Sequence, residues 1–309
     1  MARENSNPKN VEINRVSNLF SYHINVGHGN CSILVIDDGG TKRIWMVDCS
    51  DFDFIESHSY WSNIESCINY ICLKYELDNF RIDKFFLTHT HFDHFSGMKK
   101  LINETYLNGA EVWINLHYSW ASPIYNEILS KLKTIGVSFV EPIEQNSTGN
   151  INIWHPTLRT VRSKTQKYAN DNVKEIKNVN NSSVIYQFVF DDKSIVFPGD
   201  IETQGWDSIN KCFPYLNETS YFCISHHGSL NGHVRNYCPK GVSISSIAEC
   251  KKVFKNAILM GMDKAYNGIY STKVLSDFSN LIVKTEECPA GKSCKFIEID
   301  FLTDSISYF

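Results

Sequence analysis

The chain has 309 residues and a formal net charge of −4 at pH 7, with 30 Lys and Arg residues against 34 Asp and Glu residues. Hydrophobic residues make up 42% and charged residues 21%, which are ordinary globular values and exclude a disordered chain, a collagen-like repeat and a coiled coil. The mildly acidic balance also excludes a general nucleic-acid coat protein, because no overall positive charge attracts phosphate.

The N-terminus predicts a loose polar segment over residues 1–17, since its first residues contain no apolar core of a secretory signal. No stretch approaches the roughly 18 consecutive apolar residues that cross a bilayer, so we predict a cytoplasmic protein that does not associate with membranes. The 10 cysteines are scattered and form no Cys-x-x-Cys pair. We expect them to be reduced and to pack as small apolar side chains, with a disulfide or a zinc–thiolate site as the alternative.

Strand-like runs alternate with helical patterns along the whole chain. In the N-terminal half the pattern predicts strands at 19–26, 31–36 and 43–47, a helix at 61–75, a strand at 84–87, a helix from residue 98, a strand at 111–116 and a helix at 124–132. In the C-terminal half it predicts a hairpin of strands at 184–190 and 194–197, strands at 221–225 and 257–260, a helix at 271–278, and strands at 281–284 and 295–301. Hairpins followed by strand–helix units, repeated in the second half, favour an α/β fold of two sheets flanked by helices, in one domain spanning residues 1–309.

The strongest functional signal is the motif His89-x-His91-x-Asp93-His94, which follows directly after the predicted strand at 84–87. Imidazole nitrogen and carboxylate oxygen are ligands for zinc, manganese or iron, and the lack of a thiolate argues against a structural zinc site. A polar loop that happens to be rich in histidine is the alternative. Three histidines and one aspartate within six residues make that alternative a poor one.

Two other predicted strands are also followed by possible metal ligands. Asp200 follows the strand at 194–197 through a Pro-Gly pair, and His226 and His227 follow the strand at 221–225. A two-metal site needs a carboxylate that can bridge both ions and a further imidazole beyond the first motif. The three strand ends together therefore predict a dinuclear metal site.

These motifs resemble those of the metallo-β-lactamase-fold hydrolases. Within that superfamily the chain is similar to the hydrolase domain of the ComEC-type DNA-uptake proteins, as a free-standing protein. The further segments that carry this likeness are Asn25-Val-Gly-His-Gly-Asn30, Met46-Val-Asp-Cys49, Asn180-Asn-Ser-Ser-Val184 and Ala265-Tyr-Asn-Gly268. The resemblance implies a four-layer αββα sandwich with the metal site at the sheet edge between the layers.

The resemblance also implies a role for each motif residue. The ligands would be His89 and His91 for one ion, Asp93 and His94 for the other, Asp200 as the bridge, and His226 or His227 to complete the second site. The expected cofactor is a pair of divalent ions, zinc or manganese, with iron as a further candidate. The sequence leaves open which of the paired histidines is the ligand, and the other would contact phosphate or pack as a buried neighbour.

In the family that the chain resembles, the first ion has a third imidazole just before the hairpin, where this chain has Asn180-Asn181. His155 is the nearest upstream candidate for that ligand, with a packing or hydrogen-bonding role beside Pro156 as the alternative. Asn181 is assigned a supporting position beside the ligands.

Asp48 is assigned a supporting role in which its carboxylate orients a ligand histidine, as carboxylates often do. A plain turn carboxylate at a strand end is the alternative for Asp48. The neighbouring Asp51 and Asp53 are interpreted as part of a solvated loop.

A local basic stretch at residues 159–177 precedes the Asn180 turn in this acidic chain. Basic groups beside a metal site favour a polyanionic substrate, so nucleic acid or a nucleotide is the expected partner. The candidate substrate-binding residues are Arg159, Arg162, Lys164 and Lys167. A solvated loop with incidental lysines is an equally weighted alternative.

We therefore predict a metal-dependent hydrolase, a phosphodiesterase or nuclease that uses a hydroxide activated by two metal ions, with Asp93, His226 and His227 as catalytic candidates. One alternative is hydrolysis of a small phosphodiester, a lactone or a thioester. Another, from a different class, is a non-catalytic metal-binding regulatory module. The sequence is also compatible with a protein partner encoded in the same operon, and it leaves the oligomeric state open.

Overall fold

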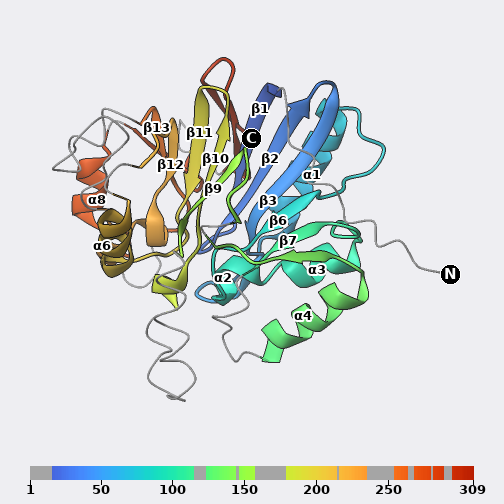
Figure 1. Ribbon diagram of the computed structural model, residues 1–309, viewed down its shortest axis with the longest axis horizontal. Coiled ribbons are helices and arrows are strands. Elements are labelled where there is room, and N and C mark those ends of the chain that lie inside the picture. Colours follow the sequence, from blue (N-terminus) through green and yellow to red (C-terminus); the bar gives the residue numbers. More distant parts are fainter. Residues whose placement is uncertain are drawn as a thin grey trace.

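The computed structural model shows two β-sheets packed face to face, with helices covering both outer faces (Figure 1). It describes residues 16–114, 123–143, 146–156, 179–213, 216–234, 254–263, 268–279, 281–288 and 294–309. This is the four-layer αββα sandwich that the sequence predicts. Among the described residues, no helix combines the length and the apolar character needed to cross a membrane.

The first sheet has eight strands in the order β16-β15-β1-β2-β3-β6-β7-β8. Their bounds are β1 Val16–Ile24, β2 Cys31–Asp38, β3 Thr41–Cys49, β6 Lys84–Phe86, β7 Glu111–Trp113, β8 Ser138–Val140, β15 Phe296–Asp300 and β16 Ser305–Tyr308. Strands β1, β2 and β3 pair antiparallel, whereas β3, β6, β7 and β8 pair parallel. The carboxyl ends of the parallel strands therefore lie at one edge of this sheet.

The second sheet has six strands in the order β14-β13-β12-β11-β10-β9. Their bounds are β9 Ile151–His155, β10 Ile185–Phe190, β11 Lys193–Phe197, β12 Tyr221–Cys223, β13 Asn256–Leu259 and β14 Ile282–Lys284. Strands β11 to β14 pair parallel, so their carboxyl ends also share one edge. A small separate hairpin is formed by β4 (Phe52–Asp53) and β5 (His58–Ser59).

Helices cover the sheets with amphipathic faces. On the first sheet lie α1 (Trp61–Lys74), α3 (Met98–Asn103) and α4 (Pro123–Thr134), and on the second lie α6 (Thr203–Cys212) and α8 (Thr272–Asp277) (Figure 1). In α1 the buried residues are Ile64, Cys67, Ile68 and Ile71. This spacing of three and four residues places them on one stripe that faces the sheet.

Aromatic side chains hold the two sheets together. The ring centroids of Phe86 on β6 and Phe188 on β10 lie 4.8 Å apart, and Trp45 on β3 lies 5.4 Å from Phe188. All three side chains are almost fully buried. Burying rings of this size stabilises the folded state by several kcal/mol. The resulting packing of the two sheets brings the carboxyl ends of β6 and β11 close to one another.

The predicted elements agree with the structure to within a few residues, but several described elements were not predicted. Strands β4, β5, β8, β9 and β16 and helices α2 and α6 have no counterpart in the predicted set. In α6 only Gly205, Trp206 and Ile209 are buried, and most of the other residues are polar, so its apolar period is too short to detect. Strand β1 begins at Val16, so the predicted loose segment does not extend to residue 17, and residues 1–15 lie outside the described part.

The cysteine prediction was wrong for one pair. Cys288 and Cys294 form a disulfide, with their Cα atoms 5.4 Å apart. Six other cysteines of the described chain are free thiols, most of them buried as expected for small apolar side chains. Cys238 and Cys250 lie outside the described residues.

Candidate metal centre

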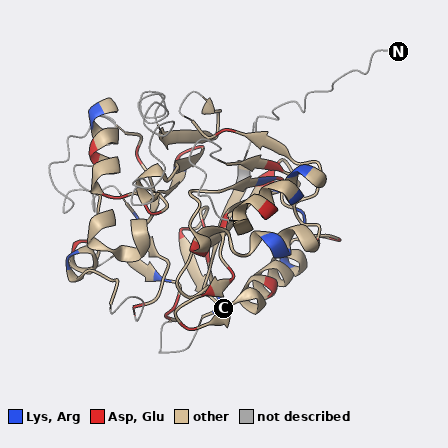
Figure 2. Cartoon of the chain, turned by 90° about the horizontal axis from the view of Figure 1, so that it is seen from below, with Lys and Arg blue, Asp and Glu red and all other residues tan. Residues whose placement is uncertain are grey.

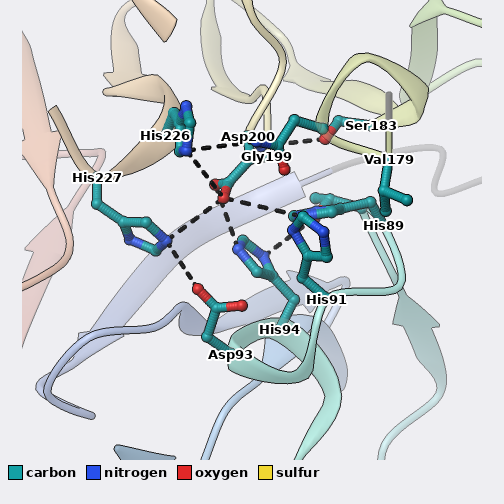
Figure 3. A network of polar contacts seen from close by, with 12 residues as sticks. His89, His91, Asp93, His94, Val179, Ser183, Gly199, Asp200, His226 and His227 are labelled. Atoms are coloured by element: carbon teal, nitrogen blue, oxygen red, sulfur yellow. Dashed lines mark hydrogen bonds and ion pairs between the residues drawn. The ribbon is translucent and has the colours of Figure 1, made fainter. Parts of the chain in front are cut away.

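Three strand ends converge at the edge where the sheets meet. Strand β6 leads into the His89–His94 motif, β11 leads through Gly199 to Asp200, and β12 leads to His226 and His227. The single-turn helix α2 (Phe92–Phe95) begins inside the motif. Figure 3 shows the histidine side chains arranged around the Asp200 carboxylate.

One group of candidate ligands consists of Asp93, His94, Asp200 and His227, whose ligand atoms all lie within 4.8 Å of one another. His94 Nε2 lies 3.2 Å from Asp200 Oδ1, and His227 Nε2 lies 3.2 Å from Asp93 Oδ2. His227 Nε2 also lies 3.5 Å from Asp200 Oδ2. Two imidazoles and two carboxylates thus face a common point.

A second group consists of His89, His91 and Asp200. His89 Nε2 lies 3.0 Å from His91 Nδ1 and 3.8 Å from Asp200 Oδ2. Asp200 therefore belongs to both groups, which is the position that a bridging carboxylate occupies between two cations.

The first group fits a cation by its charge and its hydrogen bonds. His94 Nε2, His227 Nε2 and Asp200 Oδ1 are buried, and none of them makes a well-directed hydrogen bond. Burial alone would lower the pKa of His227, but Asp200 and Asp93 outweigh burial and raise it to about 10. Burial also opposes protonation of His94, yet Asp200 and Asp48 raise its pKa well above the usual value. The carboxylates therefore hold positive charge at these nitrogens, where a metal ion would replace the protons.

Each of two histidines has its other ring nitrogen bound to a fixed acceptor. His94 Nδ1 lies 2.7 Å from Asp48 Oδ2, and His227 Nδ1 lies 3.1 Å from the carbonyl oxygen of Met260. When each imidazole is neutral, these contacts place the proton on Nδ1 and leave the Nε2 lone pair facing the cluster. Metal-binding histidines have this arrangement.

Asp48 lies behind His94 rather than in a solvated turn. Its oxygens accept hydrogen bonds from the backbone N–H and the hydroxyl of Thr88, each at 2.7 Å, and its side chain is fully buried. Desolvation raises the pKa of Asp48, while His94 and Thr88 oppose that rise. The carboxylate thus holds both the motif backbone and the His94 ring.

We expect Asp48→Asn to weaken metal binding by about 10- to 100-fold, because a neutral amide accepts the His94 proton more weakly than a carboxylate does and replaces one acceptor oxygen with a donor NH2 group. Titration of the metal-free protein with zinc or manganese measures this change in Kd. Asp78→Asn, at an exposed position, is the matched control. Unchanged affinity in Asp48→Asn would show that Asp48 does not orient His94.

Two glycines allow the backbone to approach the ligands closely. A Cβ at Gly199, whose φ is +57°, would lie 2.7 Å from Thr88 Cβ. A Cβ at Gly29 would lie 2.7 Å from the carbonyl oxygen of Asp93, the same oxygen that accepts a 3.0 Å hydrogen bond from Asn30 N. Only glycine fits these two positions without displacing the motif.

The paired histidines occupy different places, although both have left-handed backbone conformations, with φ of 51° and 49°. His227 is buried within the first group. His226 belongs to neither group, lies 4.0 Å from Asp200 Oδ2 and lines the cleft beside Asn180. The structure therefore favours His227 as the ligand, a choice that the sequence left open.

His155 is not brought into either group of the described residues. It is buried at the end of β9, and its Nδ1 lies 2.8 Å from the carbonyl oxygen of Ser183. This is the hydrogen-bonding alternative for that residue. Asn181 supports the turn after Asp200 rather than a ligand ring, because its Oδ1 accepts from the backbone of Glu202 and Gly205.

The expectation of a solvated loop around Asp51 and Asp53 was wrong. Both side chains are buried, and Asp51 pairs with Lys100 at 2.7 Å. Asp53 accepts hydrogen bonds from the backbone N–H groups of His28 (2.8 Å) and Ile55 (2.7 Å). These bonds hold the β4–β5 hairpin against the turn that contains His28, which lies next to the candidate ligands.

His28 is a site residue that sequence reasoning missed. Its Nε2 lies 3.6 Å from Asp93 Oδ2, and its ring centroid lies 4.2 Å from that of His227. Desolvation lowers the pKa of His28 to about 4, so the ring is neutral near pH 7. Its place in the segment at residues 25–30, one of the segments that carry the family resemblance, was the available signal.

The site opens into a cleft of about 800 Å³. Its described lining includes the motif residues, aromatic side chains and neutral polar groups, with no Lys or Arg among them. In Figure 2 several of the Lys and Arg residues of the described chain lie on the peripheral helices. The predicted substrate-binding residues Arg159, Arg162, Lys164 and Lys167 lie outside the described residues.

No family model matches the chain, and no curated protein is found as its relative. Among solved structures, YhfI from Bacillus subtilis, described as a metallo-β-lactamase fold protein, is 9% identical over 91% of this chain and 99% of that chain, with a TM-score of 0.44. Unliganded yeast PDE1 is 12% identical over 86% and 97%, with a TM-score of 0.46. CmlA, a diiron β-hydroxylase from Streptomyces venezuelae, is 15% identical over 85% and 50%, with a TM-score of 0.42. These likenesses concern the mixed α/β fold alone, and none of the three is described as a ComEC-type protein.

Proposed function

We propose that the chain is a metal-dependent phosphodiesterase. The observation that carries this proposal is the convergence of two groups of candidate ligands on the single carboxylate of Asp200. Two cations that share a carboxylate can interact with both the attacking and the leaving oxygen of an in-line displacement at phosphorus. The site also opens to a cleft with room for a substrate of nucleotide size.

Two divalent ions bound here would supply a hydroxide at neutral pH and neutralise the charge that develops on phosphate oxygens. The chain would hold them with His89, His91, Asp93, His94, Asp200 and His227. Nitrogen and oxygen ligands suit zinc, manganese or iron. Because Asp48 and the Met260 carbonyl already fix two of the rings, little reorganisation would accompany binding.

The residues around the ligands would position the substrate and exclude water. His226 lines the cleft 4.0 Å from Asp200, where it could donate a hydrogen bond to a substrate oxygen. Asn180 lies 3.4 Å from His226 and lines the same cleft. We therefore assign His226 to the substrate and His227 to the metal.

We further propose that the chain is a relative of the ComEC-type hydrolase domains. This rests on the motifs around Gly27, Asp48, Asn180 and Asp200, each of which lies within or directly behind the site. From the sequence alone, we also propose that the basic stretch at 159–177 contributes to substrate binding.

The direct test is hydrolysis of bis(4-nitrophenyl) phosphate by the protein loaded with manganese or zinc. We expect turnover that a chelator removes and that His91→Ala lowers more than about 100-fold, because a ligand of the second group is lost. His58→Ala, at an exposed histidine, is the matched control and should retain full activity. A metal-loaded protein that cleaves a lactone or thioester instead, or no ester at all, would contradict the proposal.

A further inference from the structure

The outer wall of the cleft carries an apolar patch that the metal chemistry does not require. Phe54 and Ile55, between β4 and β5, are 62% and 44% exposed and line the cleft. The ring of Phe54 lies 4.5 Å from that of Phe92 and 5.2 Å from that of Phe52, by centroids. Exposed clusters of large apolar side chains at a cleft mark binding surfaces.

The position of this aromatic patch is fixed relative to the candidate ligands. Asp53, which is fully buried, accepts hydrogen bonds from the N–H groups of Ile55 (2.7 Å) and Glu56 (3.2 Å) through Oδ1. Its Oδ2 accepts from His28 N at 2.8 Å, and the His28 ring packs against His227. The exposed ring of Phe54 is therefore held at the mouth of the site rather than on a free loop.

The other surfaces of the cleft are neutral and able to form hydrogen bonds. Asn180, Ser229, Asn231 and Ser271 line it, together with Leu230, which is 46% exposed. Within the described residues, the charged groups of the lining are carboxylates and site histidines, without Lys or Arg. A long polyanion gains its affinity from several cationic contacts to phosphates, which this part of the cleft does not offer.

We propose that the cleft binds a small phosphodiester that carries one nucleobase, with the base stacked on Phe54 and the phosphate at the Asp200 centre. A flat nucleobase gains stacking energy on the exposed phenyl ring, and removing the faces of both rings from water costs little. The neutral amides and hydroxyls supply partners for the edges of the base and for sugar hydroxyls. This inference rests on the proposed phosphodiesterase function and names its substrate class.

The test compares two esters with the same leaving group, thymidine 5′-(4-nitrophenyl phosphate) and methyl 4-nitrophenyl phosphate. We expect the metal-loaded wild type to prefer the nucleoside ester. Phe54→Ala should lower kcat/KM for that ester by about 10-fold or more, because base stacking is lost, and change the methyl ester less than about twofold. Phe54→Trp should retain the preference, whereas Phe54→Leu should not, which distinguishes stacking from general apolar contact. Leu73→Ala, at an 81% exposed residue of α1, is the matched control.

Equal losses for both esters, or no loss in Phe54→Ala, would overturn the inference while leaving the phosphodiesterase function intact. A strong preference for a long single-stranded oligonucleotide over the nucleoside ester would also overturn it. If neither ester is cleaved, the proposed function fails. Thymidine 5′-monophosphate binding to metal-loaded wild type and Phe54→Ala, measured by calorimetry, then tests the base site alone, and equal affinity for the two proteins contradicts it.

Discussion

Replacing Asp200 with Asn is expected to remove most of the bound metal and to lower phosphodiesterase activity by more than about 100-fold. Asp200 is the residue that both candidate ligand groups share. Its oxygens lie 3.2 Å from His94 Nε2, 3.5 Å from His227 Nε2 and 3.8 Å from His89 Nε2. An amide has nearly the same shape but lacks the negative charge that would hold two cations.

The measurement is metal content and activity of Asp200→Asn after dialysis against a defined excess of manganese or zinc. Asp192→Asn changes the same chemical group at an exposed turn before β11 and should leave both quantities unchanged. If Asp200→Asn keeps its full metal content, Asp200 does not bridge the ions. If only one of two ions is lost, the bridging role is also wrong, although the site remains a metal site.

The metal-free protein is expected to lose stability as the pH rises from about 6.5 to 10, and the metal-loaded protein to lose much less. In the folded state the pKa of His227 is raised from its ordinary value of 6.5 to about 10, because Asp200 and Asp93 outweigh the effect of burial. The folded state therefore binds a proton that the unfolded state releases in this range. The free energy of unfolding then falls by about 1.4 kcal/mol per pH unit for each such proton.

The carboxylates limit stability at the acidic side. Burial alone would raise the pKa of Asp200, but His227, His94 and His226 outweigh it and lower that pKa well below the usual range. A lowered carboxylate pKa contributes stability above the unfolded value near 3.8, and that contribution is lost as the pH falls further. Burial lowers the pKa of His28, His89 and His91, so below pH 6.5 the unfolded state binds protons that the folded state does not, and stability falls as the pH drops. We therefore expect this cluster to stabilise the metal-free protein most near pH 6.5.

Urea unfolding of the chelator-treated protein at pH 6, 8 and 9.5 measures this dependence. The free energies of unfolding of His227→Gln, measured in the same series, are subtracted from those of the wild type. The difference removes the contribution of tyrosines and lysines that titrate near pH 10 and leaves that of His227. His58→Gln serves as the exposed control. A wild-type stability that does not fall relative to His227→Gln over this range would contradict the charge balance described for the site.

The sequence predicts the residues of the site better than it predicts which helices and strands form and where they end. His89, His91, Asp93, His94 and Asp200 lie next to strand ends, and parallel strands place their carboxyl ends at one edge, so convergence follows from the pattern. The choice between two adjacent histidines does not follow. It depends on two consecutive left-handed residues, which direct His227 inward and leave His226 on the cleft.

Other features depend on contacts between segments far apart in the chain. Asp53 lies in a loop that looks solvated, but it is buried because it accepts the backbone N–H of His28, 25 residues earlier. His155 has the residue type of a ligand, yet the carbonyl of Ser183 determines its orientation. Helix α6 was missed because its buried side is short, and the Trp206 ring reaches the Gly232 carbonyl through a hydrogen bond that local sequence does not encode.

The metal-to-protein ratio tests most directly whether this site holds two divalent metal ions around Asp200. The protein would be stripped with a chelator, reloaded with zinc or manganese, dialysed and measured by elemental analysis. We predict about two ions per chain in the wild type and fewer than about one in Asp200→Asn. A wild-type ratio of about one or below would contradict the dinuclear site.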